Sequence, residues 1–429
     1  MNICIYINNS GIKNVDCSNL LIGNPGIGGT EYCILFLAQI YKKQYPSDKV
    51  VLIVHDNGLL PSVDEIIVCK DLLEVPYQAK KSGADVLVVS SLYNGQPLPE
   101  TFFENADNSK INVITWGHNY YLADYCERLV KCRYVKANVF VGRQQYDRYI
   151  DHKIIDKSTY IYNMYPQNEK IRRKSVDKPV VTYIGSLVPM KGFQVLATAW
   201  KTILSAVPNA ELNVIGSGKL YSRDAQLGSY GIADKAFEKR IMPCLTDETG
   251  NILPSVHFLG VLGAEKDEVI AHTSVGVVNP TGRTETFGIS ALDFESMSVP
   301  VVTIAKGGFL DTVIDKKTGL LYQNEKELPE KVIELLKDIP KNEQYGAEGY
   351  LLSKSFAPEI IIQQWHELFH AVINGETIPY RSPDSFYHTN LKRWRILNRN
   401  LKKKLHIKNG VSVIGLETMA RKLLRRLGR

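Results

Sequence analysis

The chain has 429 residues, and its 52 Lys and Arg against 45 Asp and Glu give a formal net charge of +7. This length is too great for one ordinary hydrophobic core and favours two domains. Hydrophobic residues make up 44% and charged residues 23% of the chain, which excludes a mostly disordered protein. Seven cysteines without a C-x-x-C pair exclude a disulfide scaffold and a zinc ribbon, so we expect the reduced thiols of a cytoplasmic protein.

Short apolar runs alternate with helical patterns over the first 165 residues, and no run approaches the roughly 20 residues of a membrane span. The first run, Ile3–Ile7, is typical of a strand rather than of a secretory signal peptide. Further strands are predicted at 50–54, 85–89, 111–115, 137–141 and 158–162, and helices at 30–45 and 122–132. Because continuous Val- and Ile-rich runs are typical of strands covered on both faces, we predict a parallel α/β domain at 1–165.

A polar stretch at 166–178 is predicted to be an interdomain linker. The alternation then restarts, with strands predicted at 179–184, 211–215, 255–259, 275–278 and 300–303, and helices at 190–207, 265–272, 287–297 and 325–338. These elements predict a second Rossmann-like domain at 179–354. Ligands of open parallel sheets bind beyond the carboxyl ends of the strands, so we expect the chemistry in the loops that follow strands.

Two glycine motifs follow predicted strands. In the first, Gly26–Glu31, the glycines would let the backbone approach a ligand closely, and the next helix would offer amides to an anion. A glycine-rich turn before a helix explains this motif equally well. The second, Gly185–Gly192, places Lys191 at a helix start, where a flexible positive charge suits a phosphate. Taken alone, a surface lysine near a turn is the better interpretation of Lys191.

The third motif, Glu285–Asp293, is the most informative. It carries two carboxylates eight residues apart, one just before a predicted helix and one about two turns into it. Eight residues at 3.6 per turn rotate by about 80° beyond two full turns, so both carboxylates lie roughly on one side of the helix. Carboxylates accept hydrogen bonds from sugar and ribose hydroxyls, and the amides of a helix start receive phosphate. The motif therefore favours a sugar nucleotide as ligand.

At these residues the chain resembles the retaining glycosyltransferases of the GT-B type, family four, group 1. The resemblance runs from residue 1 to about residue 370 as short motifs in a shared order. The motifs are Gly28-Gly29-Thr30-Glu31, Trp116-Gly117-His118, Tyr162-Asn163, Gly185–Gly192, Val256–Gly260, Glu285–Asp293, Pro300-Val301-Val302, Gly307-Gly308, Thr318-Gly319-Leu320, Ser355-Phe356 and Trp365. The resemblance implies the GT-B fold, in which two Rossmann-like domains face a cleft, and it implies that residues 355–375 form a helix crossing back to the first domain.

The resemblance also implies roles for single residues. Glu285 would hold hydroxyls of the donor sugar, Lys191 would neutralise the diphosphate, and Asp293 would contact the ribose. The base would lie near Phe258–Val261. The residues that would bind the donor are Gly28, Gly29, Lys191, Arg283, Phe287, Gly288, Ile289, Ser290 and Asp293. His118 would sit beside the transferring sugar and act in catalysis together with Glu285. Such enzymes usually need no metal or other cofactor, and the chain shows no D-x-D motif.

The chain departs from the family pattern at two positions. Ser186 stands where the family commonly has an Arg, which supplies bidentate phosphate contacts that a Ser cannot make. Arg283 is a candidate to compensate for it. The second carboxylate is Asp293 rather than the usual Glu, so the nucleotide must sit closer; Glu295 should point elsewhere on the helix. Before the family is considered, His118 is explained equally well as a hydrogen-bonded structural residue.

Residues 376–429 lie outside the resemblance and form a basic tail. From residue 375 onward there are 14 Lys and Arg against three acids, a net charge of +11, which leaves −4 for the first 374 residues. Three- and four-residue spacings of Leu and Trp, as in Leu391, Trp394, Leu397 and Leu401, predict basic amphipathic helices. Such helices suit the surface of an anionic membrane. The alternatives are a helix packed on the body of the protein, a solvated tail, a partner-docking helix or, least favoured, a nucleic-acid arm.

Together these observations predict a retaining glycosyltransferase of surface polysaccharide or lipopolysaccharide biosynthesis. It would take a nucleoside diphosphate sugar, UDP-linked rather than GDP-linked, and a saccharide or lipid-linked saccharide acceptor. We expect it in the cytoplasm, peripheral on the cytoplasmic membrane face, without a nucleic-acid partner. The alternatives are another nucleotide-sugar enzyme, such as an epimerase or a hydrolase, and a catalytically degenerate scaffold, which Ser186 and Asp293 motivate.

Overall fold

The protein is described by a computed structural model, which covers the chain apart from residues 168–170, 172, 175–177, 220–225, 408–409 and 427–429. Most of the central part of the predicted linker therefore lies outside the described residues. The chain divides into two compact units. The first comprises Met1–Leu20, Thr30–Met164 and Pro358–Arg429, and the second comprises Leu21–Gly29 and Tyr165–Ala357.

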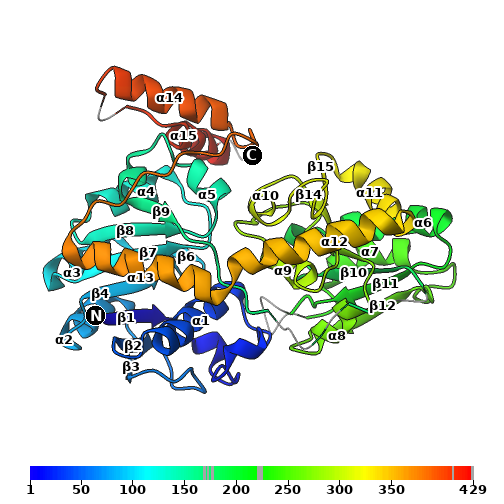
Figure 1. Ribbon diagram of the computed structural model, residues 1–429, viewed down its shortest axis with the longest axis horizontal. Coiled ribbons are helices and arrows are strands. Elements are labelled where there is room, and N and C mark those ends of the chain that lie inside the picture. Colours follow the sequence, from blue (N-terminus) through cyan, green and yellow to red (C-terminus); the bar gives the residue numbers. More distant parts are fainter. Residues whose placement is uncertain (168–170, 172, 175–177, 220–225, 408–409, 427–429) are drawn as a thin grey trace. The chain divides into compact units, whose positions relative to one another are not determined.

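The described residues of the first unit form a seven-stranded parallel sheet in the order β3-β2-β1-β4-β7-β8-β9 (Figure 1). Its strands are β1 (Asn2–Ile7), β2 (Lys49–Val54), β3 (Glu65–Val68), β4 (Val86–Ser90), β7 (Asn112–Gly117), β8 (Val135–Phe140) and β9 (Ser158–Tyr160). A separate hairpin pairs β5 (Leu92–Tyr93) with β6 (Gln96–Pro97). The sequence prediction missed β3, because this short edge strand alternates half-buried and exposed residues instead of forming a buried apolar run.

Helices cover the sheet of this unit, and further helices form its C-terminal region. They are α1 (Gly29–Gln44), α2 (Val75–Lys81), α3 (Glu100–Ser109), α4 (Ala123–Lys131), α5 (Arg143–Asp147), α13 (Pro358–Asn374), α14 (Lys392–Lys404) and α15 (Val413–Arg426). Helix α13 belongs here because it packs on α1: Tyr41 Oη lies 2.8 Å from His366 Nδ1, and the Tyr41 and Phe369 rings meet edge to face. Among the described residues, no helix is long and apolar enough to cross a membrane.

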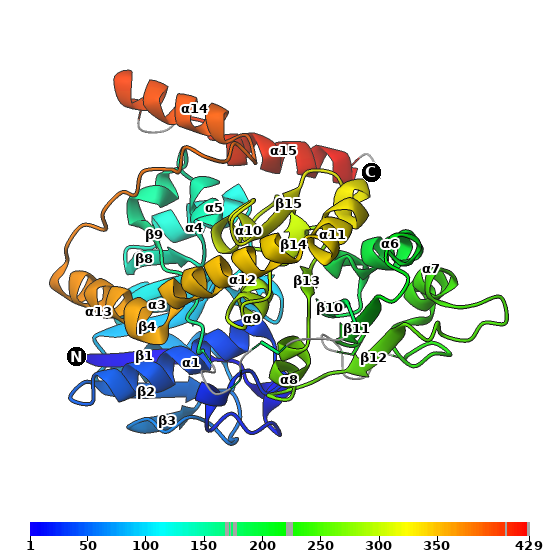
Figure 2. The ribbon, with the colours of Figure 1, turned by 45° about the vertical axis from the view of Figure 1, so that its right-hand side comes forward.

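The second unit contains a six-stranded parallel sheet in the order β12-β11-β10-β13-β14-β15, which Figure 2 shows with its helices. The strands are β10 (Val180–Ile184), β11 (Glu211–Ile215), β12 (Val256–Gly260), β13 (Val275–Val278), β14 (Val301–Ile304) and β15 (Gly319–Tyr322). The helices are α6 (Phe193–Ala206), α7 (Lys235–Leu245), α8 (Lys266–Ala271), α9 (Ile289–Glu295), α10 (Phe309–Thr312), α11 (Leu328–Lys337) and α12 (Ile339–Ser353). The sequence prediction missed β15, α7, α10 and α12.

Helices α6 and α9 begin later in the structure than predicted, and glycine explains both shifts. Residues 189–191 form a separate 3-10 turn, and Gly192 follows with a φ of +77°, so α6 begins at Phe193. Likewise, Gly288 has a φ of +88°, so α9 begins at Ile289 and not at Phe287. A residue in the left-handed region interrupts the repeating α-helical backbone, and glycine tolerates that region best. The amide of Phe287 therefore lies in a loop rather than in a helix start.

All seven cysteines are unpaired thiols, and six of them are buried. Burial raises the pKa of Cys33 to about 12 and that of Cys132 to about 11. Because the thiolate is the reactive form, these cysteines are chemically inert core residues. The six buried cysteines thus contribute to the packing of the chain.

Candidate functional site

The candidate site is built on the carboxyl ends of neighbouring strands in the second unit. Strand β10 pairs in parallel with β13, so the loops that follow Ile184 and Val278 emerge at the same edge of the sheet. The two loops touch at Gly192, where an added Cβ would lie 2.8 Å from the backbone nitrogen of Thr281. Thr281 also donates from Oγ1 to the carbonyl oxygen of Met190 over 3.3 Å. The two motifs thus form a single surface.

Lys191 and Glu285, which come from separate motifs, lie together on this surface. Lys191 Nζ is 3.1 Å from Glu285 Oε2, and the two side chains keep 20% and 15% of their exposure. The same carboxylate accepts from Asn279 Nδ2 over 3.3 Å and from the Gly288 amide over 3.2 Å. An ammonium donor and an oriented carboxylate acceptor at this distance fit a ligand that carries both an anionic group and hydroxyls.

The loop that carries Glu285 is held in an unusual backbone conformation. Asn279, Gly282, Thr284 and Gly288 have φ values of +25°, +59°, +60° and +88°. For the non-glycine residues this region costs on the order of 1–3 kcal/mol each and persists only where the surroundings impose it. Asn279 stabilises the loop by donating to the Arg283 carbonyl oxygen over 3.0 Å. The loop is therefore shaped by its own side chains before any ligand binds.

Asp293 lies in a second ion pair, which sequence reasoning did not anticipate. Its Oδ1 accepts from Lys266 Nζ over 2.7 Å and from Tyr165 Oη over 3.0 Å. Lys266 is the first residue of α8, soon after the carboxyl end of β12. The expectation that chemistry follows the strands could have marked Lys266, whereas Tyr165 had no motif to mark it. Burial, followed by the charge of Asp293, raises the pKa of Tyr165 well above its usual value, so Tyr165 is a neutral donor.

Glu295 has surroundings of its own. It is fully buried, and its Oε1 accepts from Thr318 Oγ1 over 2.7 Å. Burial raises the pKa of Glu295 well above its usual value, although the Thr318 hydrogen bond opposes this shift. Glu295 is thus a structural carboxyl group in the core, and Asp293 is the acidic residue of this helix that pairs with a cation of the site.

The contacts of Ser186 and Arg283 differ from those of the Lys191–Glu285 pair. The Ser186 side chain is buried, and its Oγ donates to the Ser217 carbonyl oxygen over 3.2 Å. Arg283 is exposed, and its backbone carbonyl oxygen is the acceptor for Asn279. The cation that contacts the second carboxylate is Lys266. Lys266 is therefore a further candidate for the positive charge that an Arg at position 186 would supply.

The amides predicted to bind the donor surround the start of α9. The Gly288 amide donates to Glu285, and Ile289 and Ser290 are partly exposed in the first helical turn. Phe287 is buried with its ring edge-on to Phe356, at a centroid distance of 5.5 Å. Gly308 lies against this loop so closely that an added Cβ would be 2.2 Å from the Phe287 nitrogen. The close backbone packing fixes where the amides lie.

The contacts of the first glycine motif, Gly26–Glu31, place its glycines in the second unit. Leu21–Gly29 groups with that unit, and an added Cβ at Gly26 would lie 3.5 Å from Val261. Asn24 Oδ1 accepts from the amides of Gly26 and Ile27, each over 2.9 Å. Gly28 is half-buried, and Gly29 is the exposed first residue of α1. Sequence analysis assigned Gly28 and Gly29 to the first domain.

His118 follows β7 in the first unit and lies in an apolar setting. Its ring is 4.5 Å from that of Trp116, which in turn packs edge-on against Trp365 at 4.7 Å. Burial lowers the pKa of His118 to about 3, so the imidazole is neutral at physiological pH. Gln145 Nε2 holds the loop by donating to the carbonyl oxygens of Gly117 and Asn119 over 2.9 and 2.8 Å. His118 is thus a fixed neutral side chain at the carboxyl end of a strand.

Within the part of the chain that the structure describes, no group of three or more His, Cys, Asp and Glu is placed to hold a metal ion. Two lysines at this sheet edge, Lys191 and Lys266, pair with the carboxylates of Glu285 and Asp293.

Comparison with known proteins agrees with this description. Residues 165–351, which lie in the second unit, match the sequence family of glycosyl transferases, group 1. An uncharacterised glycosyltransferase of Methanocaldococcus jannaschii is 24% identical over 330 residues, which span 76% of this chain and 78% of the relative. A capsular polysaccharide biosynthesis glycosyltransferase of Staphylococcus aureus is 29% identical over 204 residues, 47% of each chain. The chain thus spans about half of this second relative.

Solved structures give the fold. The crystal structure of HepE of Anabaena in complex with UDP-glucose superposes with a TM-score of 0.62 at 15% identity, over 86% of this chain and all of that one. The expected fold class is confirmed: two parallel-sheet α/β domains of the GT-B type are present, together with a helical C-terminal region.

Proposed function

We propose that the chain is a retaining glycosyltransferase that moves a sugar from a nucleoside diphosphate donor to a saccharide acceptor. The observation that carries the proposal is the contact between Lys191 and Glu285, 3.1 Å apart on a preshaped loop of a group 1 glycosyl transferase domain. A binding site for phosphate needs a cation, and a binding site for sugar hydroxyls needs an oriented hydrogen-bond acceptor. The pair supplies both within the span of one donor molecule.

Each residue of the site has a role in this proposal. Lys191 binds the diphosphate and stabilises the negative charge that develops as it leaves. Glu285 accepts from hydroxyls of the donor sugar. Asp293 accepts from the ribose, while Lys266, which pairs with this carboxylate over 2.7 Å, adds positive charge near the nucleotide. Arg283 and the amides of residues 287–290, together with Gly28 and Gly29, complete the donor contacts.

The reaction breaks the bond between the anomeric carbon and the diphosphate oxygen and forms a bond from that carbon to the acceptor oxygen on the same face. The acceptor hydroxyl proton passes to the leaving diphosphate oxygen, so no protein nucleophile is required. His118, neutral because it is buried, serves the sugar by hydrogen bonding and packing rather than as a cation. The negative charge that develops in the reaction thus lies on the leaving diphosphate, and Lys191 stabilises it.

The acceptor in this proposal is a growing surface saccharide, free or lipid-linked. The support is the capsular polysaccharide role named for the Staphylococcus aureus relative. For the donor base, uridine is the first choice, since a structural neighbour was solved with UDP-glucose. Both assignments are proposals, and UDP- and GDP-sugars need to be compared directly.

A donor screen tests the proposal. The full chain is incubated with UDP- and GDP-sugars, with and without a saccharide acceptor, and products are separated by mass. We expect one donor to yield a glycosylated acceptor, with loss of transfer in Glu285→Gln and retention in the surface control Glu359→Gln. Epimer or free sugar at the full rate without acceptor would indicate another nucleotide-sugar enzyme. Absence of calorimetric binding for every sugar nucleotide would indicate a scaffold.

A further inference from the structure

The C-terminal helices α14 and α15 dock on the first unit through their charged residues. Lys392 Nζ lies 2.8 Å from Asp147 and 2.6 Å from Asp384, and its side chain is only 2% exposed. Arg395 is fully buried and pairs with Glu417 of α15. In an ordinary amphipathic helix the apolar face would be buried and these cations would face water. The usual orientation is reversed here.

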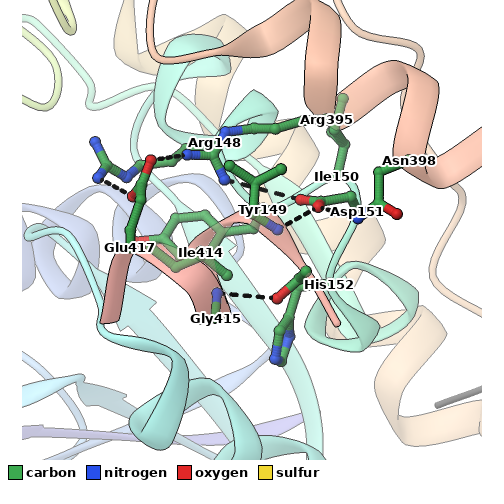
Figure 3. A network of polar contacts seen from close by, with 12 residues as sticks. Arg148, Tyr149, Ile150, Asp151, His152, Arg395, Asn398, Ile414, Gly415 and Glu417 are labelled. Carbon is green, nitrogen blue, oxygen red and sulfur yellow. Dashed lines mark hydrogen bonds and ion pairs between the residues drawn. The ribbon is translucent and has the colours of Figure 1, made fainter. Parts of the chain in front are cut away.

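The contacts that fix this orientation continue along both helices (Figure 3). Glu417 also pairs with Arg148 of the first unit over 2.6 Å. Asp151 accepts from Asn398 over 2.8 Å and from the Val413 amide over 2.6 Å. These bonds satisfy charged groups away from water, which makes their burial tolerable. The helix pair is therefore anchored in one orientation.

Helix α15 adds apolar and capping contacts to this anchor. Ile414 is 1% exposed and joins the hydrophobic core of the first unit. Thr418 Oγ1 accepts from the Ala123 amide over 3.0 Å and so binds an amide in the first turn of α4. The helix pair is part of the folded unit and not a loose tail.

Because the charged face points inward, the leucine face points outward. Its apolar side chains are between 47% and 64% exposed: Leu391, Trp394, Leu397, Leu401, Leu405, Leu416, Met419, Leu423 and Leu424. Sequence analysis found this apolar spacing, and the structure shows which way the face points. Leu427, which the same spacing includes, lies outside the described residues.

The charge around this exposed face has a single sign. From residue 377 to 426 the acids are Asp384 and Glu417, and both are held in the inward ion pairs. Among the side chains that the structure describes, the exposed cations of α14 and α15 are Arg393, Lys403, Lys404, Arg421, Lys422 and Arg426. Of these, Lys422 also contacts Asp124 over 2.5 Å while 56% exposed. The outward face thus offers Trp and Leu side chains bordered by cations.

We propose that the outward face of α14 and α15 binds the surface of an anionic lipid bilayer. Trp and Leu enter the interface between headgroups and acyl chains, and Lys and Arg meet the lipid phosphates. A protein partner would have to be both apolar and strongly acidic, whereas an anionic bilayer combines these properties over any area. The anchored orientation presents the face without further folding. This inference does not rest on sugar transfer.

Vesicle flotation of the full chain tests it. Vesicles of phosphatidylcholine alone are compared with vesicles that contain phosphatidylglycerol as well. We expect binding to the anionic vesicles, and a more than tenfold weaker partition for the triple variant Trp394→Ser, Leu397→Ser and Leu401→Ser. The matched control is Leu59→Ser with Leu351→Ser, two exposed leucines outside this face. The triple variant removes exposed side chains only, so its melting temperature should match the wild type.

A second variant keeps the test decisive if the triple variant misfolds. Lys403→Gln with Lys404→Gln removes two exposed cations and should weaken binding about 30-fold, at roughly fivefold per basic residue. Equal flotation of both variants and wild type, or absence of wild-type flotation, would overturn the proposal. The proposal would also be overturned if light scattering showed a wild-type dimer that the triple variant does not form, while the wild type binds no vesicles. A second copy of the chain would then cover the outward face. Donor hydrolysis, measured in parallel, reports on the proposed function separately.

Discussion

Ion pairs shape two regions of the molecule, and they differ in how much water reaches them. In the second unit, Lys191–Glu285 and Lys266–Asp293 keep between 9% and 20% of their side-chain exposure. In the first unit, Lys392 and Arg395 are 2% and 0% exposed. The first set lies at the carboxyl edge of a sheet, and the second joins a helix pair to a folded body. The same chemical pairing thus serves two purposes.

Accessibility explains the difference. A partly exposed pair can exchange its partner for a ligand at small cost, because the pair itself contributes little in the presence of water. A buried pair cannot, since separating it leaves an uncompensated charge away from water. The strained loop around Glu285 is also consistent with a binding surface. We infer that exposure separates ion pairs for binding from ion pairs for docking.

The largest expected effect comes from a substitution in the docking region, the buried ion pairs that join α14 and α15 to the rest of the first unit. Arg395→Ala leaves Glu417 and Asp151 without their buried partner, and we expect a loss of about 3–5 kcal/mol in the free energy of unfolding. Arg395→Met fills the same space without a charge but removes the same cation from Glu417 and Asp151, so it should be similarly destabilised. Urea denaturation followed by circular dichroism measures both. Full stability of Arg395→Ala would mean that the helix pair does not depend on this contact. Arg393→Ala, on the exposed side of the same helix, is the control.

The next largest effect comes from a substitution in the binding region, the partly exposed ion pairs at the sheet edge of the second unit. Glu285→Gln keeps the shape of the side chain but removes its charge, and we expect kcat/KM for sugar transfer to fall about 100-fold, as for loss of one electrostatic contact to a transition state. Stability should be nearly unchanged, because the pair with Lys191 is partly exposed. Transfer rates and melting temperature are measured on the same preparation. Near-normal turnover would contradict the site assignment.

The sequence predicted the fold better than the orientation of side chains. Buried Val- and Ile-rich runs predicted most of both sheets, because they reflect local burial. The resemblance implied that Lys191 and Glu285 bind one donor, and the structure brings the two side chains to 3.1 Å from each other. Sequence analysis did not anticipate Lys266 beside Asp293, since that contact joins residues brought together only by the sheet order. Nor could the spacing of Leu391 and Trp394 show that this face points outward, because that direction depends partly on Asp147 and Asp151, which pair with Lys392 and Arg395 from more than 200 residues away.

His118 extends the comparison to a buried group that titrates in the ordinary pH range when the chain is unfolded. Its folded-state pKa of about 3 lies below the ordinary value of 6.5, because burial disfavours the charged form. The unfolded chain therefore binds the proton first, and stability should fall as the pH drops below 6.5. Between pH 7.5 and pH 5 this single group should contribute up to about 2 kcal/mol to that loss. Comparing melting temperatures of wild type and His118→Gln at both pH values measures it. Identical pH dependence in the two proteins would show that His118 is not buried as described.

The smallest effect tests the second pair of the binding region. Lys266→Ala should raise the KM for the donor about tenfold while kcat changes little, because a charge-assisted contact near the nucleotide contributes to binding of the donor in both the ground and transition states. Lys266→Arg keeps the charge and should restore most of the affinity. Lys239→Ala, which removes an exposed lysine of α7, is the matched control. If Lys266→Ala lowered stability by several kcal/mol and left KM unchanged, its pair with Asp293 would belong with the docking pairs. The degree of exposure would then fail as the property that separates the two regions.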